Sequence, residues 1–322
     1  MLLCSSLAEA RRDTVCHTTA TTYVPSVIEL ESLRDSLAWQ NSYCEKHEQS
    51  EAEVVGILDA VSRISARGTC RAVLGQALEP SLSHFVQTVK CGQGVTRSVT
   101  TAVEPLYSIL RHPSGITCRE GVNGTTDLDY SLLMSTDHII TADASCPDVK
   151  SARTKIYIDL GASSWREQSQ SWMVQHFEDL GIEFDRMLFW EARPMAAADV
   201  FRDVPRSNMH AFQYFNVPCS SDPMDPANPL NVLKRIGTAE DYVVVKLDID
   251  NSAVEAEFIS QILNDPDIHS RINEFFWEPH YQMPELIACC WLDTANTSLT
   301  LTDVFENLLA MRKLGVRAHG WP

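Results

Sequence analysis

From residue 155 onward, short apolar segments that end in acidic residues alternate with segments of helical spacing. In the first of these, residues 156–158 are Ile, Tyr and Ile, a β-branched and aromatic composition that favours a buried strand. This strand ends on Asp159, and the small residues 161–164 then permit a tight turn before a helix begins. In open α/β sheets, ligands bind outside the carboxyl ends of the strands. The stretch therefore predicts one half of a nucleotide-type binding site.

The same alternation continues to the end of the chain and predicts an α/β fold with a doubly wound, mostly parallel, Rossmann-like sheet. The expected strands after the first are 187–190, 209–217, 242–247, 272–277 and 316–321. The expected helices are 172–180, 195–201, 230–236, 253–263 and a last helix that Thr302 or Asp303 caps and Gly315 ends.

The N-terminal part has a different pattern and predicts a helical extension to that sheet. Residues 1–25 are rich in Ser, Thr and Ala and indicate a poorly ordered arm. Residues 26–149 indicate a mainly helical region with loops, including a helical patch at 82–89. Residues 150–322 are expected to form the α/β domain. The function of the N-terminal region is not readable from its residues.

The composition excludes several classes of partner. A formal net charge of −17 and a pI near 4.9 argue against nucleic acid and anionic lipid, because most of the surface would repel phosphates. No apolar run approaches the roughly 20 residues of a membrane-spanning helix, so no membrane partner is expected. Nothing in the composition indicates an oligomeric state.

The ten cysteines show neither a CxxC pair nor a metal-binding spacing, so we expect most of them to be free and buried. The N-terminus has no positive charge before its short apolar patch, which argues against a signal peptide. A cytoplasmic location follows as the expectation. Two glycosylation sequons, at Asn123 and Asn296, keep the secretory pathway open as an alternative.

The loop after the first strand helps to choose the cofactor. A nicotinamide dinucleotide site would have G-x-G-x-x-G, but the loop supplies only Gly161, with Ser163 and Trp165 nearby. S-adenosylmethionine carries no phosphates and instead needs a close backbone approach and a carboxylate at the next strand end. Glu191 follows the second strand, where its ionised carboxylate can accept both ribose hydroxyls.

Three segments in this order carry a family resemblance: IYIDLGASS, FWEARP and VVVKLDIDNSAVEAEFI. Together they resemble FkbM-type S-adenosylmethionine-dependent methyltransferases, whose strand ends carry D-[VL]-G-A-[NS], an F-E-P-like segment and K-[IL]-D-[VI]-[ED]-G-A-E. The segments INEFFWEPHY and MRKLGVRAHGWP look like the later strands of the same family. The resemblance covers roughly residues 150–322 and implies a class I methyltransferase that uses S-adenosyl-L-methionine. The family prior favours O-methylation of a small molecule or glycan.

Carried over by position, the resemblance implies that Asp159, Gly161 and Ala162 line the methionine part of the cofactor. Ser163 belongs to the same cofactor loop, and Glu191 would hold the ribose.

The transfer site would lie at the end of a later strand, beside Asp248 and Asp250. Methyl transfer needs a group that removes the acceptor's proton, and the candidates are Asp248, Asp250 and His280. These residues and Glu278 could also bind a divalent ion, but their spacing is not diagnostic, and we predict no metal site.

Other interpretations of these residues stay open. Asp159 could cap the following helix, Glu191 could pair with Arg193, and Asp248 could accept hydrogen bonds within its turn. The alternative function is a catalytically inactive methyltransferase fold that serves as a binding or scaffold protein. In that case Trp165, which stands where the family often has glycine, would fill the cofactor space.

Overall fold

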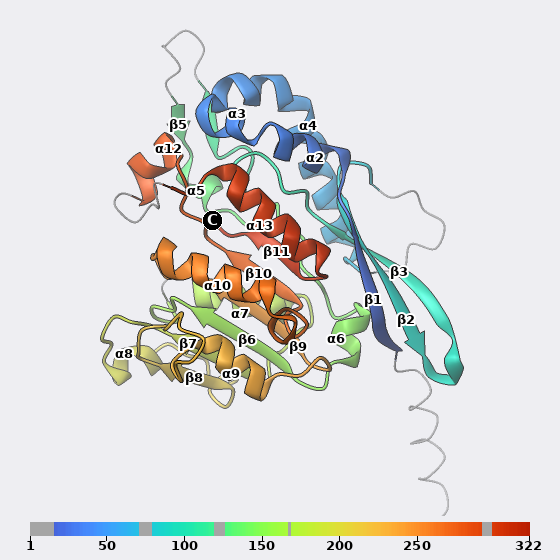
Figure 1. The fold of residues 1–322 in the computed structure, drawn as a ribbon, viewed down its shortest axis with the longest axis vertical. Helices are drawn as coiled ribbons and strands as arrows, with labels where there is room; N and C mark the ends of the chain where they lie inside the picture. The colour runs from blue at the N-terminus through green and yellow to red at the C-terminus, as the bar shows by residue number, and fades with distance from the viewer. Residues whose placement is uncertain (1–15, 71–78, 119–125, 167–168, 292–297) are drawn as a thin grey trace, which may run out of the picture.

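The computed structural model describes residues 16–70, 79–118, 126–166, 169–291 and 298–322. Its centre is a six-stranded sheet in which every neighbouring pair is parallel (Figure 1). The strands are β6 (Lys155–Leu160), β7 (Arg186–Trp190), β8 (Phe212–Phe215), β9 (Tyr242–Leu247), β10 (Glu274–Trp277) and β11 (Arg317–Gly320). They lie in the order β8-β7-β6-β9-β10-β11. This is the doubly wound order of Rossmann-like sheets, and its direction reverses between β6 and β9.

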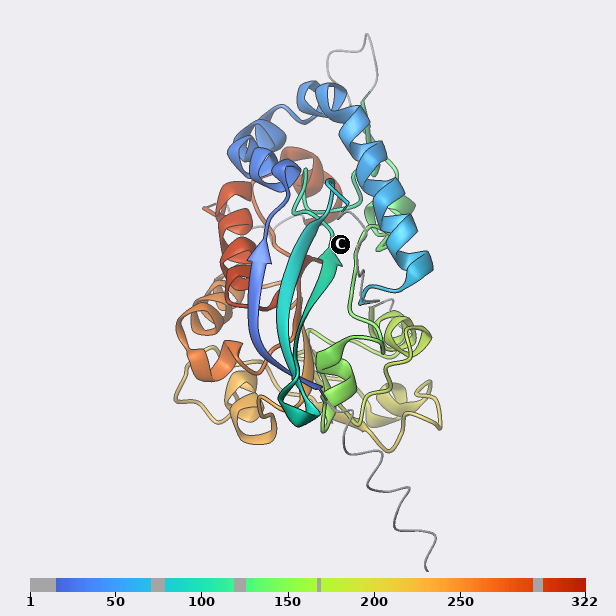
Figure 2. The same cartoon turned by 90° about the vertical axis from the view of Figure 1, so that its right-hand side faces the viewer.

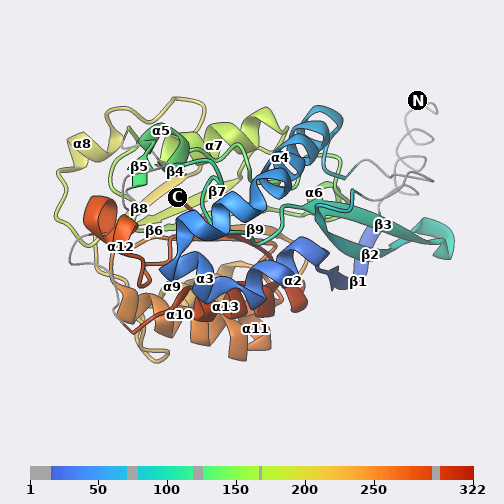
Figure 3. The ribbon, with the colours of Figure 1, turned by 90° about the horizontal axis from the view of Figure 1, so that it is seen from above.

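Helices cover both faces of this sheet and make a three-layer α/β/α arrangement (Figure 3). One layer contains α9 (Pro229–Ile236), α10 (Ser252–Asn264), α11 (Pro266–His269) and α13 (Leu301–Lys313). The other contains α7 (Ser169–Asp179). The predicted alternation from residue 155 is therefore confirmed. The predicted cap of the last helix is wrong, because Thr300 caps α13 and Asp303 completes a capping box from inside the helix.

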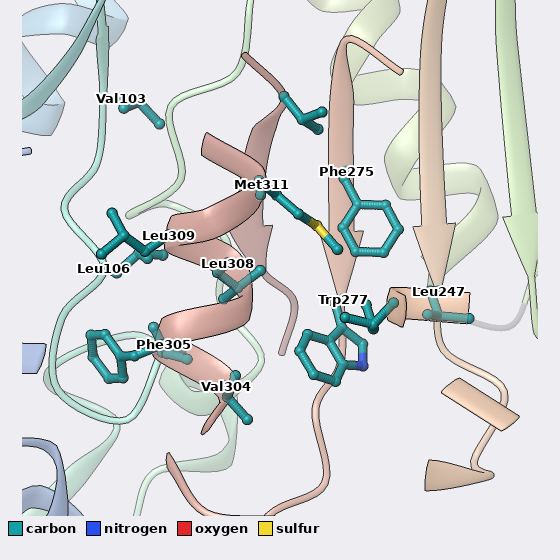
Figure 4. Packing of buried hydrophobic residues seen from close by; sticks show 14 of the residues in the cluster. Val103, Leu106, Leu247, Phe275, Trp277, Val304, Phe305, Leu308, Leu309 and Met311 are labelled. Atoms are coloured by element: carbon teal, nitrogen blue, oxygen red, sulfur yellow. The ribbon is translucent and has the colours of Figure 1, made fainter. Parts of the chain in front are cut away.

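The period-2 pattern of the strands divides the core into two clusters. In β6, Ile156 and Ile158 belong to the cluster under α10 and α13, whereas Tyr157 belongs to the cluster under α7. Figure 4 shows the first cluster, where Leu308 and Met311 of α13 lie beside β10. Every one of these side chains is almost fully buried. The alternation also places Asp159 on the α7 side, at the end of a strand that is buried on both faces.

The N-terminal part combines helices with a second, antiparallel sheet of order β1-β2-β3 (Figure 2). The arm expected at 1–25 is a strand from residue 16 onward, and residues 1–15 lie outside the described part of the chain. The helical patch expected at 82–89 is wrong as well. In β2, Phe85, Gln87 and Val89 alternate as buried residues, and the strand pairs with neighbours on both sides, which a helix could not do.

The region 26–149, expected to be mainly helical, mixes helices with strands of a three-stranded and a two-stranded sheet. The N-terminal elements are β1 (Cys16–Val24), α2 (Val27–Arg34), α3 (Ser36–Asn41), α4 (Tyr43–Arg67), β2 (Ser83–Cys91), a 3-10 helix (Gly92–Gly94), β3 (Thr96–Val103), β4 (Ile116–Cys118), β5 (Thr126–Leu128), α5 (Tyr130–Leu133) and α6 (Pro147–Ser151). The C-terminal half adds α8 (Ala197–Phe201), α12 (Pro284–Leu286) and a π-helix (Ile287–Trp291).

Three disulfides join cysteines of the N-terminal part: Cys16–Cys91, Cys44–Cys118 and Cys70–Cys146. The expectation that most cysteines are free is therefore wrong, since six of the ten are paired in these bonds. The sequence suggested otherwise because the cysteines lie far apart along the chain and show no local spacing motif. Among the described residues, no helix has the length and apolarity needed to cross a membrane.

A buried ionic cluster connects the N-terminal part to the sheet domain. Arg312 on α13 donates to Glu29 of α2 at 3.0 Å and to Glu104, which follows β3, at 2.9 Å. It also donates to the hydroxyl of Tyr23 and to two backbone carbonyls, those of Glu104 and Ala318. On β11, His319 approaches the same Glu104 carboxylate at 2.7 Å. The N-terminal part is thus an integral layer of the molecule and not an independent extension.

The His319–Glu104 pair predicts how folding stability depends on pH. Burial alone would lower the pKa of His319, but Glu104 outweighs it and raises the pKa above its usual value. The pKa of Glu104 falls to about 2, because His319 and Arg312 outweigh the effect of burial. The His319 contribution is therefore complete below the unfolded-state pKa of about 6.5 and is lost as the pH rises through the raised folded-state value. The Glu104 contribution is lost only in acid, as the pH falls towards about 2.

We expect the stability difference between the wild type and His319→Gln to be larger at about pH 5.5 than at about pH 8.5. Each unit by which the folded-state pKa exceeds the unfolded value corresponds to about 1.4 kcal/mol. Urea unfolding at both pH values measures the difference. A difference that stays constant with pH would show that His319 stabilises the fold only by packing.

Candidate functional site

A cavity of about 1300 Å³ opens at the carboxyl ends of the parallel strands, where the strand order reverses. The segments after β6, β7, β9 and β10 supply Gly161, Glu191, Asp248 and Glu278 to its lining. The N-terminal part contributes another wall through α5 and the residues that follow it. Ligand cavities of drug-sized molecules are usually about 300–1,000 Å³, so this space can hold two ligands side by side.

The loop after β6 is held firmly against its neighbours. The backbone N–H groups of Gly161 and Ala162 both donate to the carbonyl of Trp190, at 3.0 and 2.8 Å. Gly161 has φ +98°, and a Cβ at this position would lie 1.6 Å from the carbonyl oxygen of Asp248. The glycine is therefore required by the close approach of the β9 backbone. Among the predicted cofactor residues of this loop, Gly161 and Ser163 line the cavity, whereas Ala162 is buried behind it.

Glu191 is placed at the cavity by the end of β7, as its position in the sequence predicts. Its backbone N–H continues the ladder to Phe215, and its side-chain Oε1 accepts a hydrogen bond from the backbone N–H of Arg193 at 2.5 Å. This bond fixes the carboxylate beside the loop of Gly161 and Ser163 in the lining of the cavity. A half-buried, oriented carboxylate in this place is a suitable acceptor for a pair of hydroxyl groups.

Asp159 is fully buried under the cavity and is absent from its lining. Its Oδ2 accepts a hydrogen bond from Tyr157 at 2.8 Å, and its Oδ1 lies 3.6 Å from the ammonium of Lys246. Burial raises the pKa of Asp159, although Lys246 opposes the rise. Asp159 and Lys246 thus form a buried layer under the cavity, which we call the floor of the site. This role differs from the direct cofactor contact that the resemblance implies for Asp159.

Lys246 on β9 is the buried cation of this floor. Its ammonium donates to Oδ2 of Asp248 at 2.6 Å and lies 5.6 Å from the ring centre of Trp321. Burial would lower the pKa of Lys246, but the charges of Asp159 and Asp248 outweigh it and raise the pKa. Lys246 therefore remains protonated and holds Asp248 at the edge of the cavity.

Asp248 and Glu278, at the ends of β9 and β10, have pKa values that shift in opposite directions. Burial raises the pKa of Asp248, and the charge of Glu278 adds to the rise against the opposing effect of Lys246. Burial would also raise the pKa of Glu278, but His280, Arg111 and Asp248 outweigh it and lower the pKa. These opposite shifts favour a protonated Asp248 beside an ionised Glu278.

Asp250, Glu278 and His280 converge on one point of the site. One ligand-type atom of each lies within 4.8 Å of the other two. Asp250 lines the cavity with a side chain that is 70% exposed, whereas the His280 ring is only 1% exposed. Glu278 is anchored from the N-terminal part, since Arg111 donates to its Oε1 at 2.7 Å. Asp250 also has φ +54°, in the left-handed region that non-glycine residues rarely occupy.

Aromatic side chains form much of the remaining wall. Trp172, Trp190, Trp321 and Tyr130 all line the cavity. Trp165 does not: its indole is buried against Phe189 and Phe212, with ring centres 6.4 and 6.0 Å apart. The space beside Glu191 is therefore not filled by Trp165.

Several residues of the site were not predicted from the sequence. Lys246 does leave a signal, because a lysine inside an otherwise apolar strand needs a buried partner. Arg111 and Tyr130 leave none, since they lie in loop and short-helix segments of the N-terminal part that only the tertiary fold brings to the site.

No protein-family model, curated protein or solved structure matches this chain significantly. The resemblance in the strand-end motifs therefore rests on those residues alone.

Proposed function

We propose that the chain is an S-adenosylmethionine-dependent methyltransferase that acts on an oxygen of a small molecule or glycan. The observation that carries the proposal is the joint placement of Gly161, Ser163 and Glu191 around an open cavity at the reversal point of the sheet. Ligands of doubly wound folds bind at this point. The position of Trp165 outside the cavity favours this function over an inactive scaffold.

The residues present fit the cofactor by their chemistry. Glu191 offers an oriented carboxylate for the ribose hydroxyls, and Ser163 lines the space beside it. When bound, the cofactor supplies an electrophilic methyl group on a sulfonium, so the protein has mainly to align donor and acceptor and to exclude water. The fixed loop of Gly161 gives that alignment a rigid base.

The acceptor end of the cavity lies at Asp248 and Asp250, whose carboxyl groups line it. Trp172 and Trp321 line the same cavity, and aromatic side chains pack well on sugar or aromatic rings. These features support an acceptor that combines a ring with hydroxyl groups.

Calorimetric titration with S-adenosylhomocysteine, the demethylated product, tests the proposal, with NAD as the control ligand. We expect stoichiometric binding of the first and none of the second. Absence of binding by a chain shown to be folded would contradict the cofactor assignment and favour the scaffold function.

Glu191→Gln should weaken the binding of S-adenosylhomocysteine by about 1–3 kcal/mol, because the ribose hydroxyls lose their charged acceptor. Glu183→Gln is the matched control, since Glu183 is exposed and lies outside the cavity lining. The same titration measures both variants. Equal affinity of Glu191→Gln and the wild type would remove Glu191 from the cofactor site.

The proposed compartment is an oxidising one. Three disulfides in the described part of the chain weigh against the cytoplasmic location expected from the sequence, because a reducing compartment keeps cysteine thiols reduced. The asparagines of both glycosylation sequons, Asn123 and Asn296, lie outside the described residues.

A further inference from the structure

His280 projects between two carboxylates without a hydrogen bond to either. Its Nε2 lies 3.8 Å from Oδ1 of Asp250 and 3.8 Å from Oε2 of Glu278. Both distances exceed the roughly 3.2 Å of an N–H···O hydrogen bond. The nitrogens of a histidine this deeply buried normally have hydrogen-bond partners. Nε2 is directed at both carboxylates but is hydrogen-bonded to neither, which leaves room for a ligand between the three side chains.

The spacing suits a metal ion. Bonds of about 2.1 Å from a divalent ion to nitrogen and oxygen hold neighbouring ligand atoms about 3–4 Å apart. The three side chains come from two neighbouring strand ends, and they are already fixed from outside the cluster. Arg111 donates a hydrogen bond to Oε1 of Glu278, on the side away from His280 Nε2. The His280 ring packs against Trp291 with ring centres 5.3 Å apart.

The charges around the cluster favour a cation as well. Two carboxylates meet at the cluster, those of Asp250 and Glu278, and the permanent cation paired with them is Arg111. A divalent ion would reduce this excess of negative charge in a partly buried place.

The geometry points to a divalent-metal site formed by Asp250, Glu278 and His280 at the acceptor end of the cavity. Two carboxylates and one imidazole suit ions such as Mn²⁺ and Zn²⁺ better than Mg²⁺ or Ca²⁺, which prefer oxygen ligands alone. The expectation from the sequence that the chain has no metal site is revised accordingly. If the proposed methyl transfer occurs here, the ion would bind the acceptor oxygen and lower the pKa of its hydroxyl. Metal binding itself does not depend on that function.

Titration of the purified full chain with MnCl₂, followed by the paramagnetic signal of free Mn²⁺, tests the site. We expect one bound ion per chain, displaced by ZnCl₂ and not by an equal concentration of MgCl₂. Asp250→Asn and His280→Gln should each weaken binding by at least about tenfold. Asparagine also tolerates the left-handed backbone of residue 250, and that side chain is largely exposed, so Asp250→Asn should fold normally.

Glu257→Gln is the matched control, because it removes one exposed carboxylate of α10 outside the cluster and should leave Mn²⁺ binding within about twofold. Wild-type chain that binds no Mn²⁺, or an Asp250→Asn variant that binds it as tightly as the wild type, would overturn the proposal. Titration of the same samples with S-adenosylhomocysteine separates the two proposals. A chain that binds Mn²⁺ through these residues but not the nucleoside would keep the metal site and contradict the methyltransferase assignment.

Discussion

Replacement of Arg312 by methionine is expected to lower the free energy of unfolding by about 3–5 kcal/mol. Methionine fills a similar volume but leaves the carboxylates of Glu29 and Glu104 buried without their shared cation. An uncompensated buried charge is among the largest single destabilising changes in proteins. Urea unfolding with the disulfides intact measures the loss.

Lys313→Met is the matched control for this experiment. Lys313 is the next residue of α13, and its exposed side chain carries the same charge, so its loss should change stability by no more than about 0.5 kcal/mol. Adding Glu104→Gln to Arg312→Met should recover part of the stability, because one unpaired charge disappears. Similar losses in Arg312→Met and Lys313→Met would show that the buried cluster contributes little.

Gly161→Ala is expected to have the second large effect, on stability and on cofactor binding together. The new Cβ would meet the carbonyl oxygen of Asp248 at 1.6 Å, so the ends of β6 and β9 must move apart. We expect a loss at the upper end of the roughly 0.5–3 kcal/mol typical of single substitutions. We also expect S-adenosylhomocysteine to bind at least about tenfold more weakly, because small displacements of positioning groups have large effects on a site.

Gly94→Ala separates the two causes of the stability loss, which are the positive φ and the contact of the new Cβ with Asp248. Gly94 also has a positive φ, +77°, but a Cβ there would meet nothing within 4 Å. Gly94→Ala should therefore lower the free energy of unfolding by only roughly 1–2 kcal/mol, the cost of placing alanine in the left-handed region, and leave ligand binding unchanged. If both variants lost the same stability, the contact with Asp248 would not matter.

The sheet domain could be predicted from the sequence because its signals are local. Buried strands such as 242–247 are mostly apolar runs rich in β-branched residues, and each is followed by turn residues and a helical pattern. The strand ends then place Glu191, Asp248 and Asp250 at one edge without further information. A ligand crevice at the point where the strand order reverses is a general property of doubly wound sheets, whereas the strand order itself was not predicted.

The N-terminal part was harder to predict because its structure depends on long-range pairing. Residues 82–89 contain apolar positions that suit a helix as well as a strand, and only the ladders to β1 and β3 select the strand. Arg111 reaches Glu278 across more than half of the chain, which no local pattern records. The polar partners of the site thus come from segments whose sequence shows no functional signal.

The interleaved pairing of the three disulfides makes oxidative folding prone to mispairing. Each bond begins inside the loop of the previous one, since Cys44 precedes Cys91 and Cys70 precedes Cys118. Cysteines that are adjacent along the chain close shorter loops, and shorter loops form more readily. Air oxidation of the unfolded chain should therefore trap mispaired species that have to be reshuffled by thiol–disulfide exchange. Recombinant production will depend on a disulfide isomerase or a redox buffer.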